Sequence, residues 1–521
     1  MPRSFFFLTW VALITASCSS AHQDHPLDLL FVGAKVIDGE NLVIQEVNVG
    51  IQADTIAYVG KTRSLSASQT IDLSGYYLTP GFIDCHTHAL KDLSDSSRRG
   101  NLNYLLQGVT TVVTGSDGNS DNDIAGRLNH WRNNGIGTNA AILVGHRNIR
   151  KLVMGMREDA PTPEELANMK TMVQRGMEAG AIGFSSGLYY SPASFANTEE
   201  VIALAEVAAQ YGGIYDAHIR DESTYNIGLM AAVNESIQIA EAAKLPVNIS
   251  HIKCLGTDVW GQSQAIVETI NAARARGLAI TADQYPYLAS GTSLSRALLP
   301  KWVFADLEDY TQKFADPALL RQIKLGVKEN IRRRGGPASL LLVYAKIDSL
   351  NGLNLEEVAK AWDLPAVEAA LEVIRQGDAN IASFNMNPTD LKLFMQQDWV
   401  MTCSDGTVAH PRKYASFPRK IRKYVLEEKV LTLAEMVRRS SGLTAETFQI
   451  PRRGKIKEGF FADLLAFKPE EIKDNATFTA PDKLSAGMHY IILNGVVAVE
   501  KGQLKNELAG QVITSNGTKN N

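Results

Sequence analysis

The chain has 521 residues, 45% hydrophobic and 21% charged, so it can bury a large core and has room for more than one domain. A formal net charge of -4 gives no electrostatic reason to expect nucleic acid as a partner. The four cysteines lie far apart without Cys-x-x-Cys spacing, which argues against a disulfide framework and a thiolate zinc site.

The first predicted element is a secretory signal, residues 1–21. A basic residue precedes an apolar run at 5–16, which is too short to span a membrane. The TASC stretch at 15–18 resembles a bacterial lipobox, in which Cys18 would be lipidated after cleavage. Ordinary cleavage after Ala21 is the alternative. Either reading predicts export and a periplasmic location, and the first adds a lipid anchor at Cys18.

Short β-strands are predicted at both ends of the chain. The runs LLFVGAKVI, VNVGI and TIAYVG lie between residues 29 and 60 and are separated by turn residues. Similar runs recur after Gly454. We expect the two ends, 27–80 and 454–512, to build one small β-sandwich domain into which the middle, 81–453, is inserted.

The middle of the chain alternates strand-like runs with helical stretches. Residues 164–179 and 226–243 are the clearest helices, with apolar residues at three- and four-residue steps. The apolar runs are 109–115, 140–145, 181–186, 213–218, 246–251, 278–283 and 399–405. Such alternation predicts a TIM-type (β/α)8 barrel. A doubly wound open sheet is the alternative, but its glycine-rich phosphate turn is missing from the sequence.

One segment of the middle breaks this rhythm. Residues from about 289 to 339 are basic and helical, and we interpret them as an excursion from the barrel. The run of three arginines at 332–334 is interpreted as a solvated face.

Ligand-type residues follow the predicted strands. His86 and His88 lie two residues apart on an extended segment, so their imidazoles project to the same side. Ligand-type or polar residues end the later runs as well: Asp117, His146, Ser185, Ser186, His218, His251 and Asp405. The strands of a parallel barrel end at one face, and catalytic zinc takes imidazole nitrogen and carboxylate oxygen. A hydrolytic zinc site is therefore predicted, and packed histidines or a turn aspartate at 405 are the plain alternatives.

Six longer motifs carry a family resemblance. They are GHRNIRKLVMG (145–155), GAIGFSSGLYYSPASFANTEE (180–200), AHIRDES (217–223), SHIK (250–253), DQYPY (283–287) and CSDGTVAHPRKYASFPR (403–419). Together they resemble the N-acyl-D-amino-acid deacylases, or D-aminoacylases, of the amidohydrolase superfamily, over about residues 28–505. The resemblance implies a metal-dependent enzyme that hydrolyses a small molecule, an N-acyl-D-amino acid, to a D-amino acid and a carboxylic acid. The preference for the D-form comes wholly from the resemblance.

The resemblance also implies the metal ligands. His218 and His251 match the histidines of a tight zinc site, while His86, His88 and Asp405 match a second, weaker metal site.

One position departs from the family pattern. The family usually carries a cysteine ligand in a Gly-Asn-Cys-Gly turn, where this chain has Gly-Ser-Asp-Gly at 115–118. Asp117 either replaces the cysteine as a ligand, with altered metal preference, or is a turn aspartate that satisfies backbone amides.

A substrate pocket is implied by the same motifs. Arg412 matches the arginine that holds the substrate carboxylate, since a guanidinium binds carboxylate bidentately where a lysine cannot. Lys253 and Tyr285 would assist it, and Tyr190 would contact the acyl group. The family's serine at the carboxylate pocket aligns only loosely, near Ser290. Each of these residues could instead be a surface charge or an ordinary wall residue.

The implied mechanism divides the work between metal and acid. Zinc held by His218, His251 and Asp117 would lower the pKa of bound water from about 16 toward about 7 and polarise the carbonyl. Asp405 would take the proton from the water and return it to the departing nitrogen.

Two other functions fit the pattern less well. A D-configured dipeptidase or cyclic amide hydrolase would stay in the superfamily, but many such enzymes carry a carboxylated lysine where this chain has Ser185 and Ser186. A surface lipoprotein that keeps the barrel as a binding module would have lost ligands, and only the cysteine position is changed. The pattern leaves the oligomeric state open.

Overall fold

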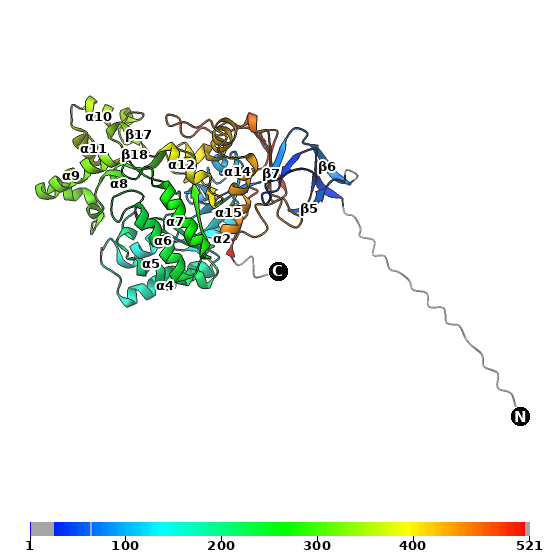
Figure 1. Ribbon diagram of the computed structural model, residues 1–521, viewed down its shortest axis with the longest axis horizontal. Helices are drawn as coiled ribbons and strands as arrows, with labels where there is room; N and C mark the ends of the chain where they lie inside the picture. The colour runs from blue at the N-terminus through cyan, green and yellow to red at the C-terminus, as the bar shows by residue number, and fades with distance from the viewer. Residues whose placement is uncertain (2–25, 63–64, 308, 516–521) are drawn as a thin grey trace.

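The computed structural model describes residues 1, 26–62, 65–307 and 309–515 (Figure 1). The apolar run of the predicted signal and Cys18 lie outside the described residues, so export and lipidation stay predictions. In the part of the chain that is described, no helix is long and apolar enough to cross a membrane.

Parallel strands at the centre form two sheets whose order follows the chain. The first sheet contains, in the order β10-β9-β8, β8 (Phe82–Asp84), β9 (Val109–Thr114) and β10 (Asn139–Ile142). The second runs β11-β12-β13-β14-β15-β19, with β11 (Val144–Gly145), β12 (Gly183–Gly187), β13 (Ile214–His218), β14 (Val247–Ile249), β15 (Ile280–Gln284) and β19 (Val400–Thr402). A doubly wound sheet reverses its order at a switch point, and this order does not reverse, so that alternative does not fit.

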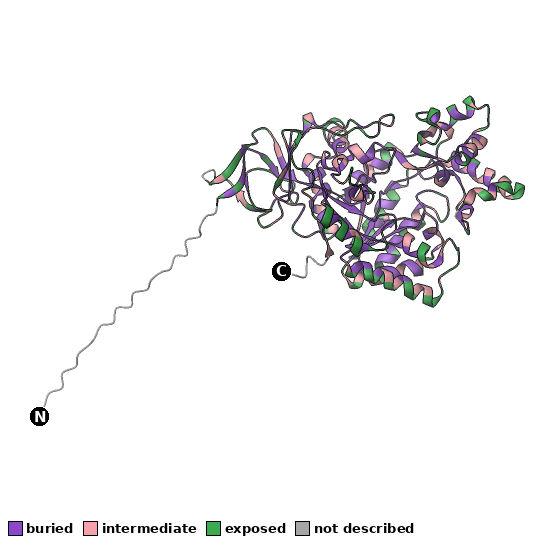
Figure 2. Ribbon diagram, turned by 180° about the vertical axis from the view of Figure 1, so that it is seen from behind, coloured by how far each residue is buried: buried purple, intermediate pink, exposed green. Residues whose placement is uncertain are grey.

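Helices cover the outer side of these strands. They are α1 (Leu102–Leu105), α2 (Ile124–Asn134), α3 (His146–Met154), α4 (Pro163–Glu178), α5 (Thr198–Gln210), α6 (Leu229–Ala243), α7 (Ser263–Ala275), α12 (Pro388–Met395), α13 (Arg412–Arg419), α14 (Leu433–Ser440) and α15 (Gly442–Thr447). The two helices predicted most clearly are confirmed as α4 and α6. Buried residues occupy the centre, and exposed ones line the outer faces of the helices (Figure 2).

The start of α4 shows how local sequence sets such a helix. Thr162 accepts a hydrogen bond from the amide of Glu165, whose carboxylate accepts one from the Thr162 amide. This capping box satisfies two amides that an isolated helix would leave unpaired. Met169, Val173 and Met177 then recur at four-residue steps and are buried against the sheet.

The two ends of the chain share a second region. A four-stranded sheet, β5-β4-β1-β6, contains β1 (Leu27–Val32), β4 (Asn48–Gln52), β5 (Thr55–Gly60) and β6 (Ala67–Asp72). A seven-stranded sheet, β23-β22-β21-β20-β7-β2-β3, contains β2 (Lys35–Ile37), β3 (Ile44–Glu46), β7 (Tyr77–Pro80), β20 (Leu464–Phe467), β21 (Met488–Leu493), β22 (Val496–Glu500) and β23 (Gln503–Leu504). The N- and C-terminal segments meet where β7 pairs antiparallel with β20. One hydrophobic cluster joins Phe31 and Val49 of the first sheet to Leu78 and Leu464 of the second.

A third region, the insert (residues 289–384), lies between β15 and β19. Its antiparallel sheet has the order β16-β18-β17, from β16 (Ala289–Ser293), β17 (Leu340–Ala345) and β18 (Ala379–Phe384). Helices α8 (Leu294–Leu298), α9 (Pro317–Arg333), α10 (Leu355–Ala361) and α11 (Ala366–Arg375) pack on it around a hydrophobic cluster of their own. It forms the green lobe at one end of the molecule (Figure 1). The predicted excursion, 289–339, covers the first part of this lobe.

The interpretation of residues 332–334 as a solvated face is wrong for the last arginine. Arg332 is exposed and pairs with Asp258. Helix α9 ends at Arg333, and the chain then turns Arg334 inward, where it is 2% exposed. Its guanidinium lies 5.7 Å from the Tyr225 ring centre and 3.5 Å from the Tyr189 hydroxyl.

Candidate metal centre

The predicted ligands come together beyond the ends of the parallel strands. His86 and His88 follow β8, Asp117 follows β9, His218 ends β13, His251 follows β14 and Asp405 follows β19. They form two groups in which the possible ligand atoms lie within 4.8 Å of one another. One group is His86, His88, Asp117 and Asp405, and the other is Asp117, His218 and His251.

Asp117 belongs to both groups and lies between them. Its Oδ1 is 3.1 Å from His218 Nδ1, 3.3 Å from His86 Nε2 and 3.6 Å from His251 Nε2, and its Oδ2 is 3.5 Å from His88 Nε2. Ligand atoms about 2.0–2.1 Å from a tetrahedral zinc are themselves about 3.3 Å apart, so these spacings fit a shared ion. This central place was not predicted from the sequence.

Several buried ligand atoms have no hydrogen-bond partner among the described residues. Both ring nitrogens of His86 and Nε2 of His218 are buried without a hydrogen bond among the described residues. Asp117 and Asp405 accept no hydrogen bond from a described backbone amide, which a turn aspartate would do. Buried polar atoms normally have a partner, so the donor set fits a bound metal cation.

The backbone is turned sharply at three of these residues. Asp117, His251 and Asp405 have φ of 57°, 35° and 46°, a region that residues other than glycine seldom adopt. Gly187 of β12 makes the turn at Asp117 possible, because a Cβ there would lie 2.4 Å from the Asp117 carbonyl oxygen. Such conformations persist where the surrounding structure enforces them, and they gather at functional sites.

The charges of the site keep its carboxylates ionised. Burial raises the pKa of Asp117, but the imidazoles of His218 and His86 outweigh burial and hold that pKa well below its ordinary value. Burial also raises the pKa of Asp405, but Arg412 and His251 hold it below its ordinary value. The ionised carboxylate is the form that binds a metal cation.

Glu222 is a member of the site that sequence reasoning missed. Its Oε1 lies 3.1 Å from His251 Nδ1, and its carboxylate pairs with Lys253. A carboxylate on the far nitrogen of a ligand imidazole fixes the orientation of the ring. The available signal was its place in the AHIRDES motif, four residues after His218.

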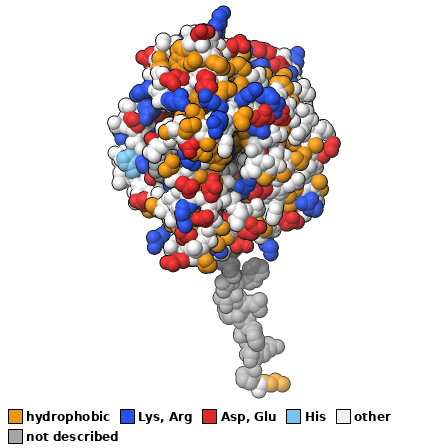
Figure 3. Space-filling view, turned by 90° about the vertical axis from the view of Figure 1, so that its left-hand side faces the viewer, with side chains coloured by type: hydrophobic (Ala, Val, Ile, Leu, Met, Phe, Trp, Pro, Cys, Tyr) orange, Lys and Arg blue, Asp and Glu red, His pale blue; other side chains and the backbone are white. Residues whose placement is uncertain are grey.

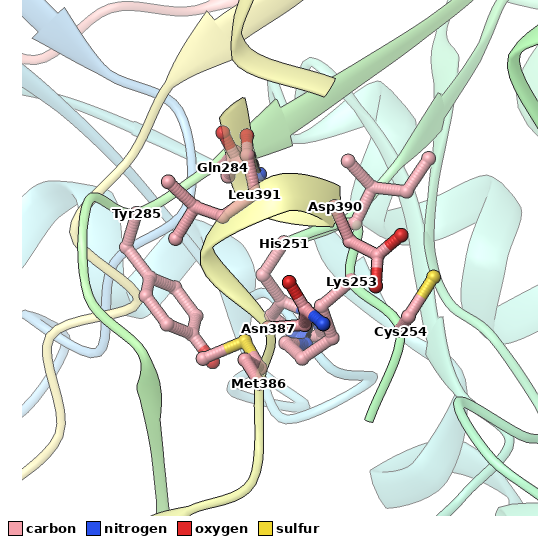
Figure 4. A pocket seen from close by; sticks show the side chains of 10 residues that line it. His251, Lys253, Cys254, Gln284, Tyr285, Met386, Asn387, Asp390 and Leu391 are labelled. Atoms are coloured by element: carbon pink, nitrogen blue, oxygen red, sulfur yellow. Dashed lines mark hydrogen bonds between the residues drawn. The ribbon is translucent and has the colours of Figure 1, made fainter. Parts of the chain in front are cut away.

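The predicted substrate residues line one cavity beside the ligands. Its walls include Tyr190, Lys253, Tyr285, Ser290 and Arg412 together with His218, His251 and Asp405. Figure 4 shows His251, Lys253 and Tyr285 around an adjoining cavity that Met386 and Leu391 also line.

Arg412 is held between an aromatic ring and a carboxylate. Its guanidinium lies 4.5 Å from the Tyr285 ring centre, and one nitrogen is 2.8 Å from Asp405 Oδ2. Ser290 Oγ lies 3.0 Å from the side-chain amide of Asn385. The Tyr190 ring centre is 4.9 Å from that of His218.

His146 and Ser185 lie outside both ligand groups. His146 Nε2 is 2.8 Å from Glu200 Oε1, and Glu200 also pairs with Arg150, so His146 is held in a separate buried network. Ser185 Oγ accepts a hydrogen bond from the Gly118 amide at 3.1 Å and therefore supports the turn that carries Asp117.

Known proteins resemble the chain along nearly its whole length. The model of the Amidohydrolase family matches residues 69–334. D-aminoacylase of Alcaligenes xylosoxydans xylosoxydans is 31% identical over 95% of this chain and 99% of its own. N-acyl-D-glutamate deacylase of the same organism is 30% identical over 90% of this chain and 93% of its own. The solved structure of N-acyl-D-glutamate deacylase from Bordetella bronchiseptica, complexed with zinc and a phosphonate mimic of the tetrahedral intermediate, matches with a TM-score of 0.81 at 29% identity, over 94% of this chain and 100% of that one.

Proposed function

The chain belongs to the amidohydrolase family and, within it, to the N-acyl-D-amino-acid deacylases, and from that premise we propose that it hydrolyses N-acyl-D-amino acids. The products are a D-amino acid and a carboxylic acid. The observation that carries the proposal is that members of both ligand groups, His218 and His251 of one and Asp405 of the other, line one pocket with Arg412, Lys253 and Tyr285.

Zinc is the proposed metal. Asp117, His218 and His251 would hold it tightly, and His86, His88 and Asp405 would form a second, weaker site. Imidazole and carboxylate donors suit zinc, and a related deacylase is complexed with it. Bound zinc supplies a Lewis acid that lowers the pKa of water and polarises the amide carbonyl.

Asp405 is the proposed proton carrier. Its Oδ1 lies 3.2 Å from His88 Nε2 and 3.9 Å from His86 Nε2, so its carboxylate is aimed at the ligand groups. In this position it takes a proton from the attacking water and returns it to the departing nitrogen, as general base and then general acid.

The α-carboxylate of the substrate would bind to Arg412, with Lys253, Tyr285 and Ser290 assisting. The Tyr285 hydroxyl and Nε of Arg412 are buried without a hydrogen bond among the described residues, so both can donate to a substrate oxygen. Tyr190, on the other side of His218, would contact the acyl group.

We further propose that the parallel strands close into a (β/α)8 barrel and that the terminal sheets form a β-sandwich domain from 27–80 and 454–512. The Asp405 amide donates to the His86 carbonyl at 3.0 Å, and the Ser404 amide donates to Asp84 Oδ1 at 3.0 Å. These bonds make the segments after β19 and β8 neighbours. The barrel would then comprise 81–453, with the insert as its excursion.

Export to the periplasm, with a lipid on Cys18, is also proposed. Its support is the apolar run at 5–16 followed by the lipobox-like TASC stretch. Metabolic labelling with a radioactive fatty acid would test it, with Cys18→Ser as the control that should lose the label.

A paired assay tests the proposed activity. Metal-analysed protein is given N-acetyl-D-methionine and N-acetyl-L-methionine, and we expect release of methionine from the D-form. Hydrolysis of the L-form alone would overturn the deacylase assignment. If neither form is hydrolysed with zinc added, the result would favour a binding protein. If only D-configured dipeptides or cyclic amides are hydrolysed, the protein would be a dipeptidase or a cyclic amide hydrolase of the same superfamily.

A further inference from the structure

Three polar side chains on neighbouring strands lie buried next to the metal ligands, and we call them the floor. They are Asp216 of β13, Asn248 of β14 and Asp283 of β15, each 0% exposed. On the face of the molecule seen from the insert end, acidic side chains are interspersed with basic ones at the surface (Figure 3). By contrast, neither acid of the floor forms an ion pair with a described lysine or arginine. Such carboxylates are costly to bury unless hydrogen bonds stabilise them.

Asn248 joins the two carboxylates. Its side-chain Nδ2 donates to Asp216 Oδ1 at 2.8 Å and to Asp283 Oδ2 at 2.5 Å. An amide NH2 group carries two N–H donors, so one asparagine can serve both acceptors. Ser250 Oγ donates a further hydrogen bond to Asp216 Oδ1 at 2.9 Å. An aspartate at position 248 would have the same shape but would offer only acceptors.

Asp283 fixes the backbone of one ligand. Its Oδ1 accepts a hydrogen bond from the backbone amide of His251 at 2.8 Å. His251 has φ of 35°, a conformation that persists only where the surrounding structure enforces it. The carboxylate contributes to this enforcement because it holds the amide of the turned residue. Asp283 therefore helps to set the direction in which the His251 ring leaves the chain.

Asp216 faces a ligand of the other group. Its Oδ2 lies 3.7 Å from His86 Nδ1, and both atoms are buried without a hydrogen bond among the described residues. The second ring nitrogen, Nε2, lies 3.3 Å from Asp117 Oδ1. A neutral imidazole has one nitrogen with a free lone pair and one that carries the proton. When Nε2 binds a metal, Nδ1 carries the proton and Asp216 can accept it in a hydrogen bond.

The floor is therefore an acceptor network rather than a third metal site. Possible ligand atoms of His86, Asp216 and Asp283 also lie within 4.8 Å of one another. However, a protonated Nδ1 is not a ligand, and Asp216 Oδ1 and both oxygens of Asp283 already accept hydrogen bonds.

Resting on the proposed zinc sites, we propose that Asn248 is a positioning residue that links the two ligand groups. It acts through Asp283 on His251 of the tight site and through Asp216 on His86 of the weaker site. A carboxylate on the far nitrogen of a ligand imidazole orients the ring, and loss of such a partner lowers metal affinity by about 10- to 100-fold. A change at position 248 alone is therefore expected to weaken both sites.

Release of zinc to a graded chelator measures the two affinities in the purified protein. In Asn248→Asp, which keeps the shape but removes both donors, we expect both affinities to fall by about 10- to 100-fold. In Asp216→Asn, which removes a buried charge and so threatens folding least, only the affinity of the weaker site should fall. Wild-type affinity of both sites in a folded Asn248→Asp protein would overturn the link. If that variant does not fold, wild-type affinity of the weaker site in Asp216→Asn would overturn it.

Asn139→Asp is the matched control. Asn139 is an equally buried asparagine, on β10, and donates to Asp463 Oδ2 at 3.0 Å outside the ligand groups. Its change should lower the unfolding temperature but leave both zinc affinities as they were.

The visible spectrum of the cobalt-loaded protein separates positioning from general destabilisation, because it reports the geometry of the ligands. We expect it to shift in Asn248→Asp and to stay unchanged in Asn139→Asp. Equal effects of the two substitutions on the spectrum and on zinc affinity would overturn the positioning role. A wild-type protein that binds no zinc and hydrolyses no N-acyl-D-amino acid would instead overturn the proposed function.

Discussion

The two walls of the pocket are built on opposite electrostatic principles. On the metal-ligand wall each charge faces a complement, as Asp405 faces Arg412 and Glu222 faces Lys253. On the wall beside the insert, Arg296, Lys301 and Arg334 form no ion pair with a described residue, and they contact tyrosine rings and a tyrosine hydroxyl. The charges of the first wall are thus paired within the protein, whereas the second wall carries positive charge that no described acidic side chain pairs.

The largest expected effect is on the first wall, at Asp405. Asp405→Asn keeps the shape of the side chain but cannot carry the proton, so we expect kcat to fall by about 10²- to 10⁴-fold with the unfolding temperature little changed. Asp121→Asn is the control, because Asp121 pairs with Arg127 outside the ligand groups and should keep its activity. An Asp405→Asn protein with wild-type kcat would refute the proton-carrier role.

The next effect is on metal binding at Asp117. Asp117→Ala removes the carboxylate that both groups share. Loss of a residue that only hydrogen-bonds to a metal ligand lowers metal affinity by about 10- to 100-fold. Because Asp117 would be a ligand itself, we expect zinc affinity to fall by more than this. Asp117→Cys should retain zinc, because thiolate is a zinc ligand. Metal content after dialysis against a graded chelator measures both. Equal retention of zinc by the alanine variant would show that Asp117 does not ligate.

A smaller effect is expected at Glu222. Glu222→Gln weakens the contact that orients His251, so zinc affinity should fall by about 10- to 100-fold while the fold persists. Glu200→Gln is a matched control, since Glu200 contacts His146, which lies outside both groups. Should the two variants bind zinc equally well, the contact with His251 would have no part in metal binding.

The smallest expected effect concerns a buried cation away from the pocket. It tests whether this cation lowers the free energy of unfolding. Lys420 begins the π-helix η7 (Lys420–Glu427), is fully buried, and donates to Thr402 Oγ1 at 2.8 Å. Burial, together with Arg439, lowers its pKa from 10.5 to about 7. Between these two values the unfolded chain holds a proton that the folded chain has lost. Stability should therefore rise with pH across this window.

Lys420→Met should flatten that rise and stabilise the protein at pH 7. Urea unfolding at pH 7, 8, 9 and 10 measures both effects. If the free energy of unfolding of the variant rose with pH as steeply as that of the wild type, Lys420 would not be the source of the pH dependence.

The parts predicted from sequence were those with a periodic or positional signature. The alternation of strands and helices predicted the run of parallel strands. The spacing of His86 and His88 predicted two members of one ligand group. The central place of Asp117 could not be predicted, because it depends on how closely the turn after β9 approaches Gly187. Arg334 was misplaced for a similar reason: three consecutive arginines look alike in sequence, and only the end of α9 separates the buried one from its neighbours.

The insert has a hydrophobic core separate from that of the strands that carry the ligands. Arg296, Lys301 and Arg334 are residues of the insert, whereas no member of either ligand group lies in the insert. A separately packed part of the chain thus supplies Ser290, Arg296 and Arg334 to the cavities beside the ligands. Exchanging this lobe between relatives is accordingly a route to new substrate preferences that leaves the hydrolytic machinery in place.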